Sequence, residues 1–394
     1  MEVPLLDLKQ QNAPLAPKLQ EAFQRVMDSG QFILGHEVEE LERTVAAVAG
    51  ARHAIGVSSG TDAILLALMA LGIGSGDEVI CPSFTFFATA GCIARAGATP
   101  VFADSCPVSF NLNVEDTARR ITPRTKAIIP VHLFGQSADM DGVMALARKH
   151  DLRVIEDAAQ ALGATYRGRS VGSIGDCGAF SFYPSKNLSG FGDGGLLTTN
   201  DDKLAARARL MRAHGAQSKY FHAVVGGNFR MDPLFAALLS VKTPYLNEYT
   251  QGRVSNAAYY TAALGRIPGV RLPQSDEPPG EARMLLPSAL PDNGHIWNQY
   301  TLRVLQSATW KQPGNPRDAL RNFLTARKIG SEIYYPRPMH LQECFAPAAS
   351  RGSIPLPVAE QLAAECLSIP IYPELRREQQ NAVIAAIGDF FGQQ

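Results

Sequence analysis

Residues 178–195 read GAFSFYPSKNLSGFGDGG and set one lysine, Lys186, between a short apolar run and a glycine-rich loop. A lysine is normally charged and solvated, but one that a strand delivers into an interior cleft loses part of its solvation. Its pKa then falls, and the neutral amine can attack a carbonyl carbon. The glycines let the backbone pass close to a flat ligand. The segment therefore predicts a nucleophilic lysine, the alternative being a solvated surface lysine.

The stretch 152–163, LRVIEDAAQALG, is an apolar run that ends in Glu156 and Asp157. It is typical of a buried parallel strand whose carboxyl end carries polar groups, where open α/β sheets bind ligands. Pyridoxal phosphate (PLP) proteins place an aspartate beside the pyridine nitrogen and bind the cofactor through a lysine. The alternative for Asp157 is a helix N-cap, and Gln160 could cap or pack equally well.

The stretch 55–71, IGVSSGTDAILLALMAL, is a β-like run followed by a serine pair, Gly60, Thr61 and an apolar helix. The free N–H groups and the dipole at such a helix N-terminus suit a phosphate. The alternative is an ordinary capped helix.

Strand and helix patterns alternate from about residue 53 to 213, which favours an α/β fold with a mostly parallel sheet flanked by helices. We expect strands at 54–57, 78–81, 99–103, 127–131, 153–155, 177–182 and 196–198, and helices at 13–29, 85–96, 140–150 and after Asp232-Pro233.

The length of 394 residues suggests two domains. We expect residues 1–245 to form an N-terminal segment and a large PLP-binding α/β domain. Residues 246–394 would form a smaller C-terminal α+β domain. Residues 267–298, rich in proline, glycine and acidic side chains, are expected to be an excursion loop of that domain.

Composition bounds the function. Thirty-seven basic and 37 acidic residues leave no net charge to favour nucleic acid or an anionic membrane. The six cysteines form no CxxC pair and no metal-ligand spacing. The start, MEVP, is unlike a signal peptide, and no apolar stretch approaches the roughly 20 residues that span a bilayer. These features predict a reduced cytoplasmic protein without a metal.

Further segments complete a series. They are SSGTDA at 58–63, GDEVICPSFTFFAT at 76–89, GATPVFAD at 97–104, TKAIIPVHLFGQ at 125–136, VIEDAAQALGA at 154–164, FSFYPSKNL at 180–188, GDGG at 192–195, HG at 214–215 and NFRMD at 228–232. In this order and spacing the chain resembles, from about residue 4 to 375, the DegT/DnrJ/EryC1/StrS family of sugar aminotransferases. These are PLP enzymes of fold-type I.

The resemblance implies roles around the cofactor. Lys186 would bind PLP covalently and shuttle protons between the cofactor C4′ and the substrate carbon. Asp157 would pair with the pyridine nitrogen, and Gln160 would approach the 3-oxygen of the ring. The residues that would hold the phosphate are Gly60, Thr61 and Ser181.

Three further residues are implied with alternatives. Phe86 would stack on the ring face, or be an ordinary core phenylalanine. Asn228 would reach the cofactor phosphate of a neighbouring subunit, which implies a homodimer with shared active sites; a turn asparagine is the alternative. Arg230 would face the substrate, or form a surface or structural salt bridge.

The implied reaction is a two-stage transamination from an amino acid, with glutamate as the expected donor, to a keto sugar carried on a nucleotide. Some family members have histidine in place of the lysine and dehydrate their substrate, so Lys186 favours the aminotransferase. The segment 333–342, IYYPRPMHLQ, looks like members that act on 3-oxo sugars, with 4-oxo sugars and keto-cyclitols as alternatives. Tyr335 and His340 are candidate substrate contacts, or they pack within a proline-rich loop.

Two rival classes are disfavoured. Residues 190–195 match GxGxxG, but a nicotinamide-binding motif should open a helix, and here a strand-like run follows. A non-catalytic regulatory protein with the same fold would not need Lys186, Asp157 and Gln160 together.

Overall fold

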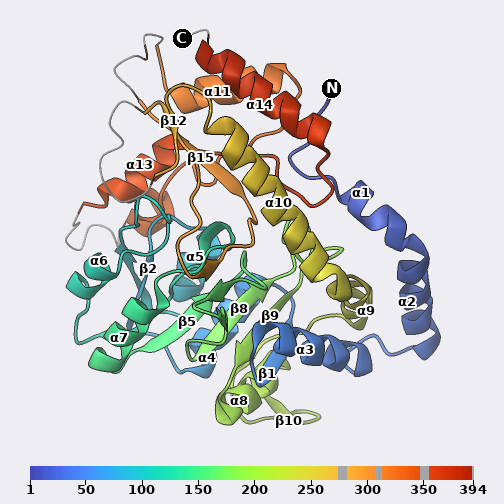
Figure 1. Ribbon diagram of the computed structural model, residues 1–394. Helices are drawn as coiled ribbons and strands as arrows, with labels where there is room; N and C mark the ends of the chain where they lie inside the picture. Colours follow the sequence, from blue (N-terminus) through green and yellow to red (C-terminus); the bar gives the residue numbers. More distant parts are fainter. Residues whose placement is uncertain (274–281, 307–309, 311–312, 347–354, 393–394) are drawn as a thin grey trace.

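The computed structural model describes residues 1–273, 282–306, 310, 313–346 and 355–392. Its main sheet has seven strands in the order β1-β9-β8-β5-β4-β2-β3 (Figure 1). The strands are β1 (His53–Val57), β2 (Glu78–Pro82), β3 (Thr99–Ala103), β4 (Thr125–Ile128), β5 (Arg153–Asp157), β8 (Cys177–Ser181) and β9 (Gly195–Thr199). Only β9 runs antiparallel to its neighbours within this sheet. The predicted mostly parallel α/β sheet is confirmed.

Helices cover both faces of this sheet. Alternate strand residues enter different cores: Ile55 and Ile155 pack in one with α4, while Ala54 and Val154 face the opposite side. The helices are α1 (Leu8–Asn12), α2 (Ala16–Ser29), α3 (His36–Ala49), α4 (Gly60–Ala70), α5 (Phe87–Arg95), α6 (Val114–Arg119), α7 (Met140–His150), α8 (Asp202–Arg212), α9 (Pro233–Lys242), α10 (Leu246–Leu264), α11 (Pro316–Ala326), α13 (Pro357–Glu365) and α14 (Arg377–Gly392). No helix in these described ranges is long and apolar enough to cross a membrane.

Several boundaries differ from the predicted ones by one to three residues, and two of these differences follow from the local backbone. The strand expected at 127–131 ends at Ile128, since Pro130 has no N–H to donate to a neighbouring strand. The helix expected from residue 85 begins at Phe87, because Phe86 is extended, with φ −70° and ψ 149°. The motif at 190–195 leads into β9, as its strand-like sequel indicated.

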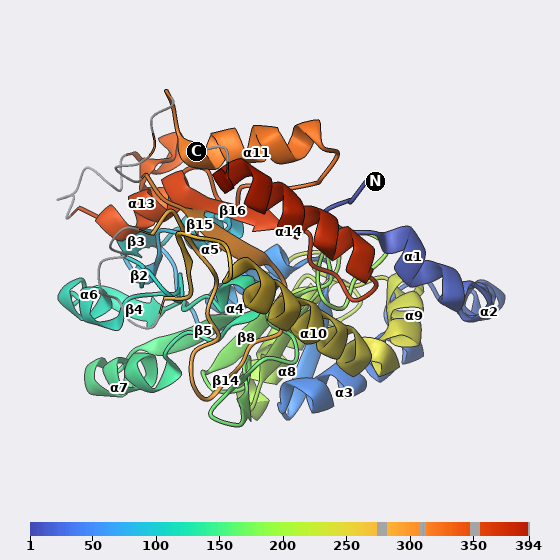
Figure 2. The ribbon, with the colours of Figure 1, turned by 45° about the horizontal axis from the view of Figure 1, so that its top comes forward.

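A second sheet lies in the C-terminal part of the chain, in the order β12-β13-β15-β16. Its strands are β12 (Val270–Arg271), β13 (Met284–Leu285), β15 (Tyr300–Val304) and β16 (Cys366–Ile369). Figures 1 and 2 show α10 running from the end of α9 toward α14, which packs beside it. The division of the chain at residue 245 stays a prediction.

The predicted excursion loop at 267–298 is wrong in part. It contains β12, β13 and β14 (Asn293–Gly294), and β14 pairs with β6 (Thr165–Tyr166), which in turn pairs with β7 (Arg169–Ser170). Strands of two residues are too short for an alternating pattern, so proline and glycine dominated the prediction. Residues 274–281 of this stretch lie outside the described part of the chain.

A buried ion pair between Glu42 and Arg212 holds the end of β1 in place. Glu42 of α3 accepts a hydrogen bond from the backbone N–H of Gly56 at 2.7 Å. Arg212 of α8 bonds the same carboxylate and donates to the carbonyl oxygen of Gly56 at 3.1 Å. Both side chains are almost fully buried. The pair therefore anchors β1 two residues before Ser58, where the chain turns into α4.

We expect Glu42→Ala to lower the free energy of unfolding by about 3–5 kcal/mol, because it leaves the Arg212 charge buried and unpaired. Urea denaturation measures this. Glu39→Ala, at an exposed position of the same helix, should change it by less than about 1 kcal/mol. Equal unfolding midpoints for the two variants would contradict the assigned role of the pair.

Candidate active site

Adjacent parallel strands bring Asp157 and Lys186 together. Asp157 ends β5 and pairs with Ala179 of β8, and Lys186 lies in the turn that follows β8. Burial lowers the pKa of Lys186 to about 8, and the negative charge of Asp157 raises it in part. The site therefore holds an amine that is much easier to deprotonate than a solvated lysine.

The carboxylate of Asp157 is buried and has two protein donors. Burial raises its pKa, while hydrogen bonds from the Thr89 hydroxyl and the backbone N–H of Ala159 lower it, as does the charge of Lys186. The Thr89 bond measures 2.7 Å and the Ala159 bond 3.2 Å. The Ala159 contact resembles the cap that sequence offered as the alternative, but Thr89 comes from α5, a distant segment. Thr89 also lies 3.1 Å from the hydroxyl of Thr85.

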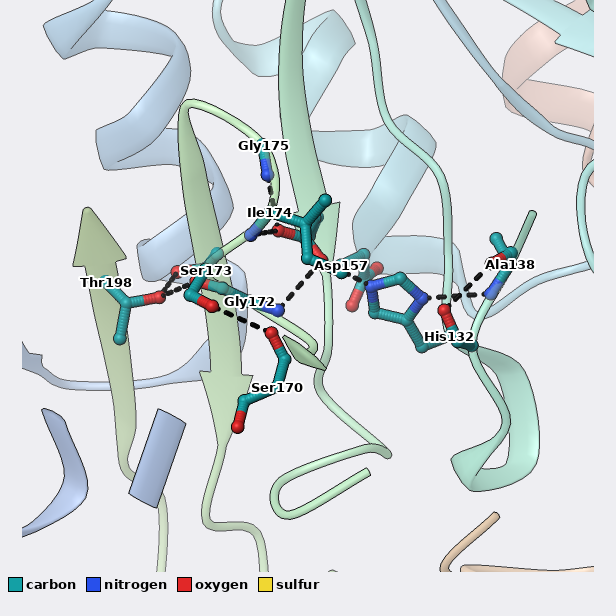
Figure 3. A network of polar contacts seen from close by, with 12 residues as sticks. His132, Ala138, Asp157, Ser170, Gly172, Ser173, Ile174, Gly175 and Thr198 are labelled. Atoms are coloured by element: carbon teal, nitrogen blue, oxygen red, sulfur yellow. Dashed lines mark hydrogen bonds and ion pairs between the residues drawn. The ribbon is translucent and has the colours of Figure 1, made fainter. Parts of the chain in front are cut away.

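A second buried hydrogen-bond network surrounds Glu156, the residue before Asp157 in β5. Neighbouring Glu156 accepts backbone N–H bonds from Gly172 at 2.8 Å and from Ile174 and Gly175 at 2.7 Å. Its carboxylate also lies 2.9 Å from Nε2 of His132. Figure 3 shows the His132 ring between Ala138 and the end of β5.

The hydrogen bonds define the tautomer of His132. The backbone N–H of Ala138 donates to Nδ1 at 3.1 Å, so Nδ1 is an acceptor, and Nε2 carries the hydrogen and donates a hydrogen bond to Glu156. The backbone N–H of His132 in turn donates to the carbonyl oxygen of Asp157 at 3.0 Å. His132 thus supports the strand end that carries Asp157.

The side chains of Gln160 and Tyr335 are hydrogen-bonded to each other near the Asp157 carboxylate. The Gln160 side chain accepts from the backbone N–H of Phe134 at 2.7 Å and donates to the Tyr335 hydroxyl at 3.1 Å. Burial raises the pKa of Tyr335. Its ring lies 6.2 Å from that of Phe86, which is 56% exposed and is therefore not an ordinary core phenylalanine.

The N-terminus of α4 abuts the ends of β8 and β9. The Ser59 hydroxyl accepts from the backbone N–H of Asp62 at 3.0 Å, so it caps the helix. A Cβ added at Gly60 would lie 2.8 Å from Cβ of Ser181, and one at Gly195 would lie 2.3 Å from the Ser59 carbonyl carbon. The first N–H groups of a helix lack acceptors within it. Gly60, Thr61 and Ser181 therefore form one polar cradle.

The segment with Asn228 and Arg230 runs beside this cradle. The carbonyl oxygen of Phe229 accepts from the backbone N–H of Ser58 at 3.0 Å. The backbone of Arg230 forms an isolated antiparallel β-bridge with Val57. The side chain of Asn228 is exposed. Nε of Arg230 is buried without a hydrogen-bond partner among the described residues, which also provide no ion pair for it.

His340 has protein partners at both ring nitrogens. Nδ1 lies 2.6 Å from the Ser83 hydroxyl, and Nε2 lies 3.3 Å from a Glu360 carboxylate oxygen. Burial lowers the pKa of His340, and Glu360 raises it in part. Such contacts suit the packing alternative, in which His340 holds its loop against β2.

Thr89, His132 and Glu156 are the polar residues that sequence reasoning left without a role. All three lie in motifs of the series: Thr89 at the end of GDEVICPSFTFFAT, His132 in TKAIIPVHLFGQ and Glu156 in VIEDAAQALGA. Only the folded chain shows that Thr89 and His132 reach the end of β5.

Comparison with known proteins gives a consistent result. The sequence matches the DegT/DnrJ/EryC1/StrS aminotransferase family over residues 15–388. A pleiotropic regulatory protein of Geobacillus stearothermophilus is 46% identical over 391 residues, 99% of each chain. A UDP-N-acetyl-3-dehydro-α-D-glucosamine 3-aminotransferase of Acidithiobacillus ferrooxidans is 44% identical, over 98% of this chain and 97% of the relative.

Solved structures agree. DesV of Streptomyces venezuelae, in complex with a ketimine intermediate, superposes with a TM-score of 0.89 at 41% identity, covering 99% of this chain and 98% of that one. NtdA of Bacillus subtilis, with bound pyridoxamine phosphate (PMP), superposes with a TM-score of 0.88 at 27% identity, covering 100% and 86%. These matches confirm the resemblance: the chain is a fold-type I, PLP-dependent enzyme and belongs to the DegT/DnrJ/EryC1/StrS aminotransferase family.

Proposed function

We propose that this enzyme transfers an amino group from an amino acid, with L-glutamate as the donor, to carbon 3 of a nucleotide-linked 3-oxo sugar. The observation that carries the transamination is the pairing of Lys186, with its lowered pKa, and buried Asp157. Carbon 3 is supported by relatives named for 3-position chemistry on UDP and dTDP sugars, which are 44%, 42% and 38% identical.

The residues present fit PLP. Asp157 would hold the pyridine N–H, and the lowered pKa of Lys186 suits attack on the aldehyde carbon. Gln160 keeps a second amide N–H beside the one given to Tyr335, and this would approach the 3-oxygen. The cradle of Gly60, Thr61 and Ser181 would hold the phosphate at the N-terminus of α4.

PLP, when bound, supplies an electron sink for the bond changes at the substrate carbon. The protein must then hold and move protons. Lys186 would carry a proton to and from the substrate carbon, for which a pKa near working pH is favourable. The hydrogen bond from the Thr89 hydroxyl lowers the pKa of Asp157 and so opposes part of the effect of its burial, and His132 holds the strand end in place. Phe86 and Tyr335 would cover one ring face and exclude water.

The substrate contacts and the assembly belong to the same proposal. Arg230, whose buried Nε has no hydrogen-bond partner among the described residues, and Tyr335 are the preferred sugar-nucleotide contacts, while His340 would position the loop that carries Tyr335. Asn228, exposed beside the phosphate cradle, would serve the cofactor of a second subunit in a homodimer. We also infer a domain boundary near residue 245, just before α10 begins at Leu246, and a cytoplasmic location.

The substrate assignment is tested with purified, PLP-loaded enzyme and glutamate. UDP- and dTDP-linked 3-oxo and 4-oxo sugars and a keto-cyclitol are supplied separately, and mass spectrometry follows the conversion of a keto group to an amino group. We expect 3-oxo sugars to be converted. Conversion of 4-oxo sugars alone, or of a keto-cyclitol alone, would contradict the proposal, and no conversion would favour a regulatory role.

Lys186 should be the residue that borohydride links to PLP, and Lys186→Ala should abolish turnover. The rate at which PLP-free enzyme captures PLP should rise with pH up to about 8 and then level off, because only the neutral amine attacks. Stopped-flow absorbance measures the rate, and peptide mapping locates the label. A label on another lysine would refute the assignment.

Asp157→Asn should reduce turnover by roughly 100-fold or more, well beyond its effect on PLP affinity, because no charge then holds the pyridine proton. Removing this charge also lowers the pKa of Lys186, so the PLP-capture profile should move to lower pH.

Thr89→Val is the matched variant for Asp157→Asn. It removes only one donor to the carboxylate, so turnover should fall by about 10- to 100-fold. If Asp157→Asn turned over at a near-normal rate, the carboxylate would be merely structural.

Mixing two impaired parents tests the shared site, because Lys186→Ala should abolish turnover and Asn228→Ala should weaken PLP retention. When Lys186→Ala subunits exchange with Asn228→Ala subunits, one site of each mixed dimer collects both lesions and the other collects neither. Random exchange makes half of the dimers mixed, so about a quarter of the wild-type sites should be restored. Activity that stays at the parental level, despite subunit exchange confirmed by mass spectrometry, would mean that Asn228 serves its own subunit.

A further inference from the structure

Lys242, the last residue of α9, is a fully buried lysine that the proposed reaction does not use. Its Nζ donates to the side-chain oxygens of Gln11 at 3.0 Å and Asn12 at 2.9 Å, and also to the hydroxyl of Ser189. An ammonium has three N–H donors, and three acceptors surround this one. The Ser189 hydroxyl in turn donates to Gln11 at 2.7 Å.

The charge of Lys242 is buried at a cost. In the described part of the chain no carboxylate forms an ion pair with it. Burial lowers the pKa of Lys242 to about 8, and the carboxyl of Glu374, whose own pKa burial raises, opposes this only in part. A buried ammonium whose hydrogen-bond partners are neutral side chains destabilises the fold relative to an apolar side chain. The cost of burying the Lys242 ammonium therefore has to be offset by what this side chain does at its place in the fold.

Ser189 belongs to the same closed loop as Lys186. The backbone N–H of Gly190 donates to the carbonyl oxygen of Phe182 at 2.8 Å, and the N–H of Phe182 donates to Gly194 at 2.8 Å. These two bonds close residues 182–194 into one loop. Ser189 is 1% exposed and attaches this loop to Lys242 and to the N-terminal helix α1.

Helix α9 holds the same loop at a second point. The ring of Phe235 fills the space above two glycines: a Cβ added at Gly190 would lie 2.3 Å from it, and one at Gly194 would lie 2.2 Å from it. Phe235 thus packs on the loop backbone, and Lys242, two turns further along the helix, bonds its side chain. The Phe235 ring and the Lys242 ammonium, both on α9, therefore hold the loop from its buried side.

We propose that Lys242 is a positioning residue for Lys186, holding Ser189 of the Lys186 loop and Gln11 and Asn12 of α1 in one hydrogen-bonded cluster. The inference rests on the proposed role of Lys186. A reacting amine must be held within about 0.5 Å of its productive position. Two buried polar side chains fix the backbone that follows Lys186: Asn187, which donates to the carbonyl oxygen of Ile296 at 3.0 Å, and Ser189, which Lys242 holds. Loss of the Lys242–Ser189 contact therefore loosens one of these two anchors.

The test compares Lys242→Met, which keeps an unbranched side chain and removes the ammonium, with Ser189→Ala, which removes only the hydroxyl. In PLP-free protein, amide hydrogen exchange of peptides covering residues 183–195 should accelerate by about 10- to 100-fold in both variants. In loaded enzyme, kcat should fall with KM for the sugar unchanged, and the pH at which the visible absorption band changes should shift.

Arg317→Met is the control, because Arg317 is another buried cation. Its partners are the backbone carbonyl oxygens of Ala363 and Cys366, outside the Lys186 loop. It should lower the melting temperature while leaving exchange of residues 183–195 at the wild-type rate. The proposal is overturned if Lys242→Met behaves like Arg317→Met, or if Ser189→Ala leaves both the exchange and the absorption profile unchanged. Should Lys242→Met fail to fold, Ser189→Ala decides alone.

The two proposals fail separately. If borohydride labels a lysine other than Lys186, the proposed function fails, whereas loop exchange in PLP-free protein still reports whether Lys242 anchors Ser189.

Discussion

The desolvation of two opposite charges at the ends of β5 and β8 is the constraint on which the active site depends. Burial favours the neutral form of both groups, since it raises the pKa of Asp157 and lowers that of Lys186. Their mutual attraction opposes this, and so does the Thr89 hydroxyl. The site therefore keeps a carboxylate that can hold a proton on a ligand and an amine that is nearly ready to lose one.

Two consecutive carboxylates divide the work between opposite faces of the sheet. Successive side chains of a strand point in opposite directions, so Asp157 faces the site while Glu156 faces the support behind it. Glu156 gathers three backbone N–H groups and His132, and His132 returns a hydrogen bond to the backbone of Asp157. The polar support is thus satisfied internally, which is what a buried network requires.

Much of this arrangement was predictable because it depends on order along the chain. Asp157 follows an apolar strand and Lys186 precedes glycines, and parallel neighbours bring strand ends together. Thr89, His132 and Lys242 were not predictable, because their partners are 68, 24 and as many as 231 residues away. Short strands such as β13 and β14 were missed for a similar reason, since two residues carry no periodicity and their pairing is tertiary.

The packing of Phe235 on Gly190 and Gly194 makes these three positions epistatic. Any side chain at either glycine collides with the ring, whereas a smaller residue at 235 would open a void beside the loop. Single substitutions at any of the three are therefore harmful. At Gly194, where the close contacts are all with the Phe235 ring, a small-to-large change combined with a large-to-small change in α9 can be tolerated. At Gly190 a Cβ would also lie 2.7 Å from the carbonyl oxygen of Phe182, so libraries meant to reshape this enzyme should vary residues 194 and 235 jointly and keep Gly190.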